Sequence, residues 1–348
     1  MKNVCIVCGG VSHEHEISLM SAQSVLTNID REKYNVHTLI IDENGSFFHT
    51  TQSGNLTKGQ WKSLKGLAPA IIAPDPKYKG ILRETESGFE RVSIDVFFPV
   101  LHGENGEDGV IQGVFKMSGV PYVGSGTLAS ASCMDKEVTH IRLDAAGIRT
   151  ARYITARVGC DIEWLNNEIK SSFGYPVFVK PANAGSSVGV GKAEDVNALM
   201  KALETAFEVD KKVLVEECIV GSEVECAVLG NEEPIAADYI GEIVPVDGFY
   251  DFDAKYVSGT TALNIPAHIP EDVSEKIRKE AVRAYKTMDC AGLSRVDFFA
   301  LENGEIVLNE INNLPGFTSI SMYPKLFEAS GIKYNELIDR IIETAELK

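Results

Sequence analysis

The sequence contains no apolar run long enough to cross a membrane, because charged and polar residues interrupt every hydrophobic stretch of the 348 residues. A membrane-spanning helix needs about 20 predominantly apolar residues. A signal-peptide pattern is also missing, since Met1 leads directly into the strand-like segment 3–10. We therefore expect a cytoplasmic protein without a membrane partner.

Cysteines spaced as in a disulfide framework are absent as well. The seven Cys are scattered along the chain, which is typical of a protein from a reducing compartment. Cys5 and Cys8 have the spacing of half a metal or redox site, but residues three apart on a strand point to opposite faces. Buried core thiols are the favoured interpretation of this pair.

Positive charge is scarce. Asp and Glu number 50 against 33 Lys and Arg, so the formal net charge is −17. Such a surface repels nucleic acids and anionic membranes, and we expect neither as a partner. A polyanionic ligand would need a local pocket of cations. The 44% hydrophobic and 24% charged content is that of an ordinary soluble globular protein.

The two standard phosphate-binding motifs are missing too. Gly9-Gly10 lacks the G-x-G-x-x-G spacing, and Gly191-Lys192 does not complete a P-loop. The chain has instead the segment KPANAGSSVGVGKA, residues 180–193, between two strand-like runs. The bare N–H groups of such a loop can approach an anion closely. A plain Gly-Ser hairpin loop is the simpler alternative.

Charged residues end two of the apolar runs. Lys180 ends YPVFVK and would supply a point charge for phosphate oxygens, whereas extension of its ammonium into solvent is the alternative. Glu216 and Glu217 lie near the end of KKVLVEECI and could accept hydrogen bonds from a ribose or an amino group. Solvated carboxylates are the alternative for this pair.

Strand and helix patterns alternate in the first third of the chain, which predicts a parallel sheet with helices on both faces. Residues 43–91 have a weaker pattern, typical of loops with an extra hairpin or helix. We predict an α/β domain over residues 1–126 and two α+β domains over 127–220 and 221–348. The expected strands are 3–10, 35–42, 93–103, 175–182, 186–193, 211–219, 223–230 and 233–245, and the expected helices are 16–29, 109–119, 128–147, 193–209, 274–289 and 334–346.

Two apolar runs near the carboxyl end, in LSRVDFFALENGEIVLNE, are joined by Asn303-Gly304, a strong signal for a two-residue hairpin turn. With that turn, residues whose numbers sum to 607 face each other. Asp297 then lies opposite Glu310, and Arg295 lies opposite Asn312, all on one face of the sheet. Opposed carboxylates repel each other, so a cation or a proton must compensate them, and a divalent cation is the expected candidate.

Eight stretches together resemble the ATP-grasp superfamily, and within it the D-alanine:D-alanine ligases with their vancomycin-resistance relatives. They occur in the order of that family over nearly the whole chain. They are GGVSHEHEISL, LHGENGEDGVIQG, GVPYVGSGTLASASCMDK, YPVFVKPANAGSSVGV, VLVEE, FYDFDAKY, SRVDFF and LNEINNLPGFTS. The resemblance implies an ATP-grasp fold that follows an amino-terminal parallel-sheet domain, with ATP held between the central and carboxyl-terminal domains.

The resemblance also implies the residues that hold ATP and metal. Lys136, Lys180 and Lys255 would offset phosphate charge, and the loop with Ser187 would cover the phosphates. The adenine, ribose and neighbouring contacts would come from Glu216, the backbone from Glu217 to Ile219, Glu223 and Phe249. Asp297, Glu310 and Asn312 match the ligands of two Mg²⁺ ions, with Mn²⁺ as an alternative, and oxygen ligands of this kind suit Mg²⁺.

Further positions match the substrate site of the family. Arg295 and the N–H of Gly316 would stabilise a tetrahedral oxygen, although Pro315-Gly316 could also be a simple strand terminator. A hydrogen-bonded set of Glu14, Ser186 and Tyr256 is expected when the lid around Tyr256 closes. Glu14 as a helix-start acid and His102 as a strand cap are the alternatives for these two residues. The substrate-binding positions are Glu14, His102, Ser321 and Met322.

The reaction implied is ATP-dependent ligation of D-alanine to D-alanine through an acyl phosphate, for peptidoglycan precursor synthesis, by a homodimer. Tyr256 and Met322 match the members that add D-alanine, whereas Ile320 departs from the His common at its position. A D-alanine:D-serine ligase of the glycopeptide-resistance type is the nearer alternative. Another ATP-grasp carboxylate-amine ligase and a non-catalytic nucleotide-binding regulator are more remote ones.

Overall fold

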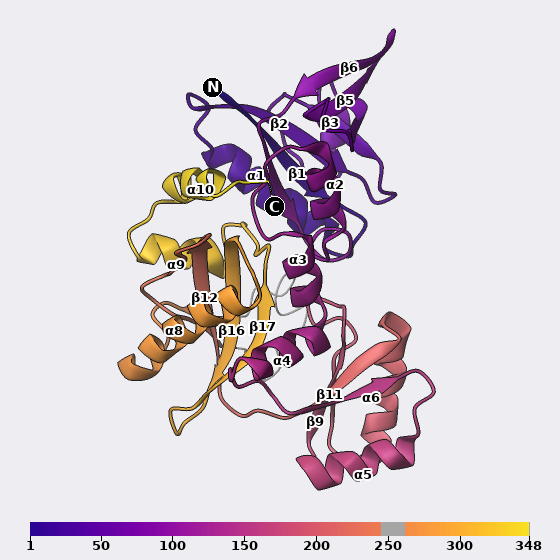
Figure 1. The fold of residues 1–348 in the computed structure, drawn as a ribbon, viewed down its shortest axis with the longest axis vertical. Coiled ribbons are helices and arrows are strands. Elements are labelled where there is room, and N and C mark those ends of the chain that lie inside the picture. The colour runs from indigo at the N-terminus through magenta and orange to yellow at the C-terminus, as the bar shows by residue number, and fades with distance from the viewer. Residues whose placement is uncertain (245–261, 348) are drawn as a thin grey trace.

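Three β-sheets follow one another along the chain in the computed structural model, which describes residues 1–244 and 262–347 (Figure 1). The first sheet has seven strands in the order β6-β5-β4-β3-β2-β1-β7. Its strands are β1 (Lys2–Gly9), β2 (Tyr34–Ile41), β3 (Phe47–Thr50), β4 (Ala68–Ile72), β5 (Gly80–Thr85), β6 (Gly88–Ser93) and β7 (Val96–Leu101).

The prediction of a parallel first sheet holds only in part. Strand β1 pairs in parallel with β2 and β7, but β2 to β6 pair antiparallel along the chain. Residues 43–91 therefore form four added strands and a short 3-10 helix, η1 (Gln60–Ser63), rather than mostly loops. Connections such as the one between β5 and β6 are too short for the crossover that parallel strands require.

Helices cover both faces of the first sheet, as expected. Helix α1 (His15–Asn28) lies on one face and α2 (Val110–Ser118) on the other. Cys8 packs in the core that contains α1 residues, and Cys5 packs in the core that contains α2 residues. Both thiols are fully buried, so their interpretation as core residues on opposite faces is confirmed.

The second sheet has four antiparallel strands in the order β10-β9-β11-β8. Its strands are β8 (Tyr153–Arg157), β9 (Val177–Pro181), β10 (Gly191–Ala193) and β11 (Lys212–Glu217). Helices α5 (Ile162–Ser172) and α6 (Val196–Val209) share its core. Asp161 and Asp195 accept hydrogen bonds from the first turns of these two helices and so set where each begins.

Within the described residues the third sheet has six strands, with β15-β14-β12-β16-β17 in order and β13 paired to β12. Its strands are β12 (Ser222–Gly230), β13 (Ile235–Ala236), β14 (Gly241–Val244), β15 (Ala262–Asn264), β16 (Gly292–Ala300) and β17 (Ile306–Asn312). Helix α8 (Glu271–Thr287) covers one face. Helices α3 (Thr127–Met134) and α4 (Lys136–Ala145) also contribute Cys133 and Leu143 to this core, while the domain boundaries stay a prediction.

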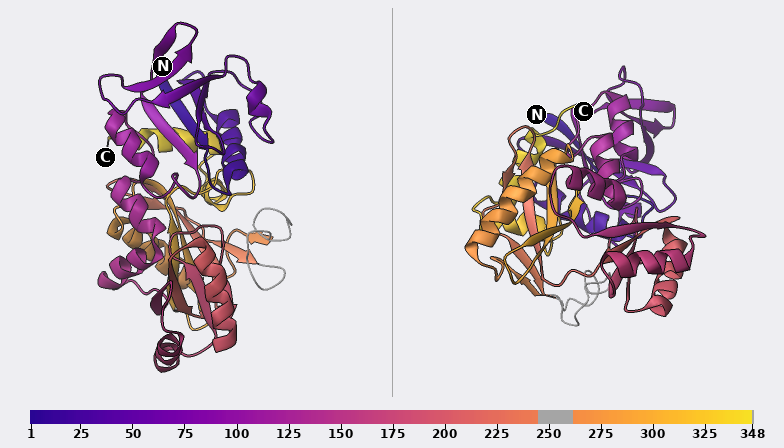
Figure 2. Two further views of the ribbon diagram at one scale, coloured as in Figure 1. Left: turned by 90° about the vertical axis from the view of Figure 1, so that its right-hand side faces the viewer. Right: turned by 60° about the horizontal axis from the view of Figure 1, so that its bottom comes forward.

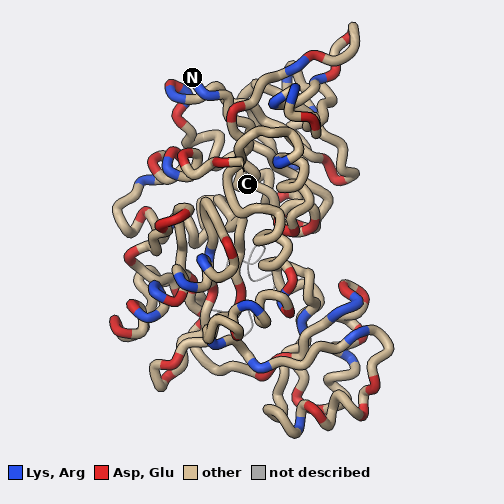
Figure 3. Tube along the Cα trace, in the orientation of Figure 1, with Lys and Arg blue, Asp and Glu red and all other residues tan. Residues whose placement is uncertain are grey.

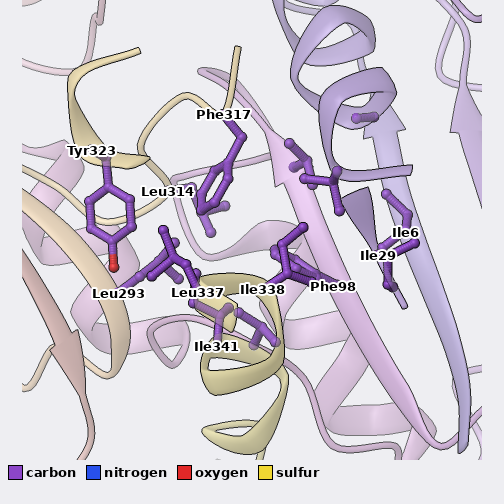
Figure 4. Packing of buried hydrophobic residues seen from close by; sticks show 14 of the residues in the cluster. Ile6, Ile29, Phe98, Leu293, Leu314, Phe317, Tyr323, Leu337, Ile338 and Ile341 are labelled. Carbon is purple, nitrogen blue, oxygen red and sulfur yellow. The ribbon is translucent and has the colours of Figure 1, made fainter. Parts of the chain in front are cut away.

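The carboxyl-terminal helices join the third sheet to the first. Helix α9 (Met322–Ala329) packs beside β12, and α10 (Tyr334–Glu343) packs against α1, as Figure 1 and Figure 2 show. Phe317 lies in the shared core near Phe98, with ring centroids 6.2 Å apart (Figure 4). Tyr334 donates a hydrogen bond to the Phe317 carbonyl at 2.6 Å. The segment that follows β17 is thereby fixed to the rigid core on both sides.

No helix among the described residues is long and apolar enough to cross a bilayer. Lys and Arg are interspersed with Asp and Glu along the described trace (Figure 3). The cations discussed below therefore belong to a local pocket rather than to a broad basic surface.

Candidate active site

The hairpin that joins β16 to β17 has a three-residue loop, so the predicted two-residue turn is wrong. The Leu301 N–H donates to the Glu305 carbonyl at 2.9 Å, and the Gly304 N–H donates to the Leu301 carbonyl at 3.0 Å. Gly304 has a φ of 79°, the left-handed conformation that ends a loop of this class. Next to the loop, paired residue numbers sum to 606, as in Phe298 opposite Leu308.

A β-bulge at Asn309 then restores the predicted register. Beyond the bulge Asp297 lies opposite Glu310, and Arg295 lies opposite Asn312, so the numbers sum to 607. The pairing expected from sequence is confirmed, although it arises from a longer loop followed by one extra residue in β17.

Three carboxylates lie in a row across adjacent strands. Glu225 of β12 pairs with Asp297 of β16, which pairs with Glu310 of β17. Glu225 is a residue that our sequence analysis missed. The signal was present, because Glu223 and Glu225 alternate along a strand and so point to the same face.

Arg295 supplies part of the charge that the opposed acids require. Its guanidinium donates two hydrogen bonds to Asp297, at 2.8 and 2.7 Å, and lies 3.1 Å from Glu225. Burial by itself lowers the pKa of Arg295, but these carboxylates raise it well above its usual value, so the group stays charged. A compensating cation was expected beside the opposed acids, and Arg295 is one such cation.

The oxygen-rich face of this hairpin fits magnesium. The Asn312 Nδ2 atom lies 3.3 Å from an Asp297 oxygen and 3.4 Å from a Glu310 oxygen, so the three predicted ligands converge. Within residues 1–244 and 262–347, no group of three or more His, Cys, Asp or Glu could by itself hold a metal ion. Mg²⁺ ordinarily takes one or two carboxylates and completes its shell with phosphate oxygens and water, which matches this donor set.

A cavity of about 700 Å³ lies between the second and third sheets, beside the hairpin face that carries the predicted metal ligands. Phe178 and Phe299, which sequence analysis missed, are among its lining residues, and Phe178 could have been found because it alternates with Lys180 along β9. The predicted nucleotide residues that line this cavity are Lys136, Lys180, Ser187, Glu216, Glu217, Ile219 and Glu223.

A buried ion pair holds Lys180 in this cavity. Its ammonium lies 2.6 Å from Glu216, and His140 lies 3.1 Å from the other Glu216 oxygen. Burial by itself raises the pKa of Glu216, but Lys180 and His140 lower it to about 2, so the carboxylate is ionised. The solvated alternatives for Lys180 and Glu216 are therefore wrong. His140 was missed, since a lone His on a helix carries no signal in the sequence.

The side chain of Glu217 is occupied elsewhere. Its carboxylate accepts hydrogen bonds from the Arg152 backbone and guanidinium, at 2.9 and 2.8 Å. Only its backbone is left for a nucleotide, which agrees with the part that the family resemblance gives it. Lys136 donates to the Ala184 carbonyl at 2.6 Å and so lies next to the Gly-rich loop.

The Gly-rich loop forms a turn over Ser186 to Gly189, and the predicted strand begins only at Gly191. Ser186 and Ser187 have φ values of 51° and 59°, a backbone that bends sharply at the cavity. The Ser186 hydroxyl donates to Glu14 at 2.5 Å, so the loop reaches the first domain. Two members of the expected Glu14, Ser186 and Tyr256 set are thus in contact.

A second cavity, of about 370 Å³, adjoins the first. Gly185, Ser186 and Glu310 line both cavities. A Cβ atom on Gly316 would lie 2.9 Å from the Ser321 hydroxyl, so a side chain at this position would require that hydroxyl to shift. The predicted substrate residues that line this second cavity are Glu14, His102, Arg295, Gly316, Ser321 and Met322.

Two more groups set the charge of the second cavity. Burial, more than the nearby Arg295, lowers the pKa of His102, so the imidazole is neutral at pH 7. Burial, followed by the repulsion of Glu14, raises the pKa of Glu107 to about 8. Glu107 also accepts a hydrogen bond from the Gly103 N–H at 2.6 Å. We missed Glu107 in the sequence, although it is an acid inside the quoted stretch LHGENGEDGVIQG.

Three predicted residues, Phe249, Lys255 and Tyr256, lie outside the described residues. The other predicted site residues all contribute to the two adjoining cavities or to the hairpin face between them. Their roles remain predictions.

Comparison with known proteins agrees with this geometry. The family described as D-ala D-ala ligase N-terminus matches residues 3–125, and the family described as D-ala D-ala ligase C-terminus matches residues 143–343. The chain belongs to the D-alanine–D-alanine ligase family. A D-alanine–D-alanine ligase of Acetivibrio thermocellus is 47% identical over 99% of this chain and 96% of the relative. One of Ruminiclostridium cellulolyticum is 48% identical over 99% and 95%.

Solved structures of this family have the same fold. The VanG D-Ala:D-Ser ligase of Enterococcus faecalis superposes with a TM-score of 0.89 at 39% identity, covering 99% of both chains. The D-alanine–D-alanine ligase of Coxiella burnetii gives 0.87 at 34% identity, covering 99% of this chain and 95% of that one. The predicted family and the ATP-grasp fold are thereby confirmed, and the chain is an ATP-dependent ligase.

Proposed function

We propose that this chain joins D-alanine to a second D-alanine with cleavage of ATP to ADP and phosphate. The observation that carries the proposal is the junction of the two cavities. Glu310 lines both, so the cavity with the proposed phosphate-binding lysines adjoins the cavity with Arg295 and Gly316 at this residue. A phosphoryl group bound on one side could meet a carboxylate bound on the other.

In the first step the carboxylate of one D-alanine attacks the γ-phosphorus, an acyl phosphate forms and ADP leaves. The step brings two anions together, and Lys136 and Lys180 would offset their repulsion. Asp297, Glu310 and Asn312 would hold Mg²⁺, which when bound neutralises phosphate charge. Lys255 is proposed to add a third cation on family resemblance alone.

In the second step the amine of the second amino acid attacks the acyl carbon, and phosphate departs with the electron pair of the broken C–O bond. Negative charge grows on the carbonyl oxygen. Arg295 and the Gly316 N–H would donate to this oxygen, and Glu14 would hold the ammonium group of the first D-alanine. Tyr256 is proposed to complete the contact between Glu14 and Ser186.

Met322 gives the proposed acceptor side an apolar patch. Met322 is buried, and a Cβ atom on Gly241 would collide with its sulfur at 2.3 Å, so Met322 is held close to the β14 backbone. Such a patch suits the methyl group of D-alanine. Ile320 is 53% exposed and lies at the edge of this cavity rather than deep inside it.

D-Serine as the second substrate is the one alternative with support from an observation. The hydroxyls of Thr318 and Ser321 lie 2.8 Å apart near Met322, and they could bond the extra hydroxyl. An apolar wall rejects a hydroxyl only modestly. The 39% identity to the VanG D-Ala:D-Ser ligase also favours this alternative, which would bring a role in vancomycin resistance.

We further propose that the product serves peptidoglycan precursor synthesis in the cytoplasm and that the protein is a homodimer. Two Mg²⁺ ions are proposed, with Mn²⁺ as a replacement. A non-catalytic regulator is disfavoured, because a chain that had lost catalysis would be expected to lose Arg295 or a metal acid, and both are present.

The proposal predicts that D-alanine alone stimulates ADP release and that D-serine added at equal concentration raises the rate less than twofold. The measurement is a coupled ADP assay with analysis of the dipeptide products. A D-alanine:D-serine ligase would give mainly the mixed dipeptide. If nucleotide binds but neither amino acid stimulates ADP release, the chain is not a ligase of this type.

A further inference from the structure

Asn309 is the extra residue of β17, and the orientation of the metal-ligand face depends on it. Between Leu308 and Glu310 the sum of paired numbers changes from 606 to 607. If the sum stayed at 606, Asp297 would face residue 309, and Glu310 would point to the opposite side of the sheet. One inserted residue therefore places Glu310 and Asn312 on the same face as Asp297.

The side chain of Asn309 has a second contact, across the nucleotide cavity. Its Oδ1 atom accepts a hydrogen bond from the Lys180 ammonium at 3.1 Å. Lys180 lies on β9 of the second sheet, and Asn309 lies on β17 of the third. The bond therefore joins the strand with the proposed metal ligands to the lysine proposed to bind phosphate.

The ammonium of Lys180 has three hydrogens, and the described contacts engage two of them. Glu216 accepts one at 2.6 Å and is itself held by His140. Asn309 accepts another. Two partners fix the rotation of an ammonium group, which directs the third hydrogen along one line. Lys180 and Asn309 both lie in the wall of the 700 Å³ cavity, so the third hydrogen can be donated to a ligand oxygen there.

We propose that Asn309 is a positioning residue. It orients the Lys180 ammonium toward the ATP phosphates and holds it at a fixed place beside the strand with the proposed metal ligands. The bulge and the side chain act together. The extra residue determines which face of β17 carries Glu310, and its amide oxygen fixes the orientation of the Lys180 ammonium. The inference rests on the proposed function only for the identity of the ligand. A phosphate oxygen is the expected partner because the remaining donor is cationic.

The test is a double-mutant cycle with Asn309→Leu and Lys180→Met, because leucine keeps the chain length and approximate size but removes the acceptor. The affinity of each variant for a non-hydrolysable ATP analogue with Mg²⁺ is measured calorimetrically up to millimolar nucleotide. We expect Asn309→Leu to weaken binding about tenfold with Lys180 present and less than twofold in the Lys180→Met background. Lys192→Met is the matched control. Lys192 lines the same cavity and pairs with Glu194, so its effect should add to that of Asn309→Leu.

Equal losses in the two Lys180 backgrounds would overturn the proposal, and so would unchanged affinity in Asn309→Leu. If the leucine variant does not fold, Asn309→Ser replaces it, since a serine hydroxyl is too short to reach Lys180. Binding is measured without amino acids, so the result is separate from the ligase proposal. If the cycle shows coupling between Asn309 and Lys180 but the protein releases no ADP with amino acids, the positioning role of Asn309 stands and the ligase proposal fails.

Discussion

Replacing Glu310 with glutamine lowers kcat for ADP release by about a thousandfold, while the ligand-free protein unfolds at the same or a higher temperature. Glu310→Gln removes one proposed metal ligand, and the charge stabilisation supplied through such a ligand is worth several kcal/mol, about 4 here. It also removes a carboxylate directly opposite Asp297, so a repulsion disappears from the ligand-free fold. Lost activity with unimpaired stability separates a ligand from a structural acid.

Steady-state kinetics at saturating Mg²⁺ and a thermal unfolding scan without ligands measure the two effects. Glu302→Gln is the matched control, because Glu302 is exposed in the loop of the same hairpin and should change neither quantity. A Glu310→Gln variant with activity within tenfold of the original would remove Glu310 from the proposed metal site.

Replacing Arg295 with methionine lowers kcat on the order of a hundredfold and also destabilises the fold by about 3 kcal/mol. The first effect follows from the loss of a donor to the tetrahedral oxygen. The second follows because Asp297 and Glu225 lose the guanidinium that compensates them, and breaking a buried pair costs about 3 to 5 kcal/mol. The side chain of Arg295 is 18% exposed, so the lower end of that range applies.

Nucleotide affinity separates the two roles of Arg295. Arg295 is not among the residues that line the 700 Å³ cavity, so Arg295→Met should bind ADP with Mg²⁺ about as well as the original protein. Arg340→Met is the control, since it breaks an exposed ion pair with Glu336 and should change stability by less than about 0.5 kcal/mol. Full activity in Arg295→Met would show that its guanidinium does not serve the reaction.

The sequence predicted the faces of the hairpin correctly for an incomplete reason. Asn303-Gly304 is the favoured pair for a two-residue turn, but Gly304 instead closes a three-residue loop. That change alone would have moved Glu310 to the other face. The bulge at Asn309 reverses it, and a bulge has no local signature in a single sequence.

Long-range contacts account for the other differences. Arg295 lies two residues before Asp297, so the sequence alone predicted that both lie on one face of the sheet. It did not predict the hydrogen bonds between them. The pair of Glu216 with His140 joins residues 76 positions apart. Neither strand β11 nor helix α4 indicates that partner in its own pattern. The strand content of residues 43–91 was underestimated, because short antiparallel strands with small apolar faces have a sequence pattern like that of loops.

The substrate side was predictable only through resemblance. Gly316, Ser321 and Met322 lie close together because Phe317 is anchored between Phe98 and Tyr334. The two anchoring residues come from β7 and α10, elements far apart in the chain. Composition and periodicity cannot bring them together, whereas the order of eight family-like stretches implies their arrangement without stating the contacts.

We propose that Asp297 and Glu310 are turned toward each other so that dications can bring the triphosphate to this strand. Crystals grown with ADP and Mn²⁺ test it directly through the anomalous scattering of the metal. The account predicts Mn²⁺ within coordination distance, about 2.0 to 2.6 Å, of oxygens from Asp297, Glu310 and Asn312. Bound ADP whose Mn²⁺ touches neither carboxylate would contradict it.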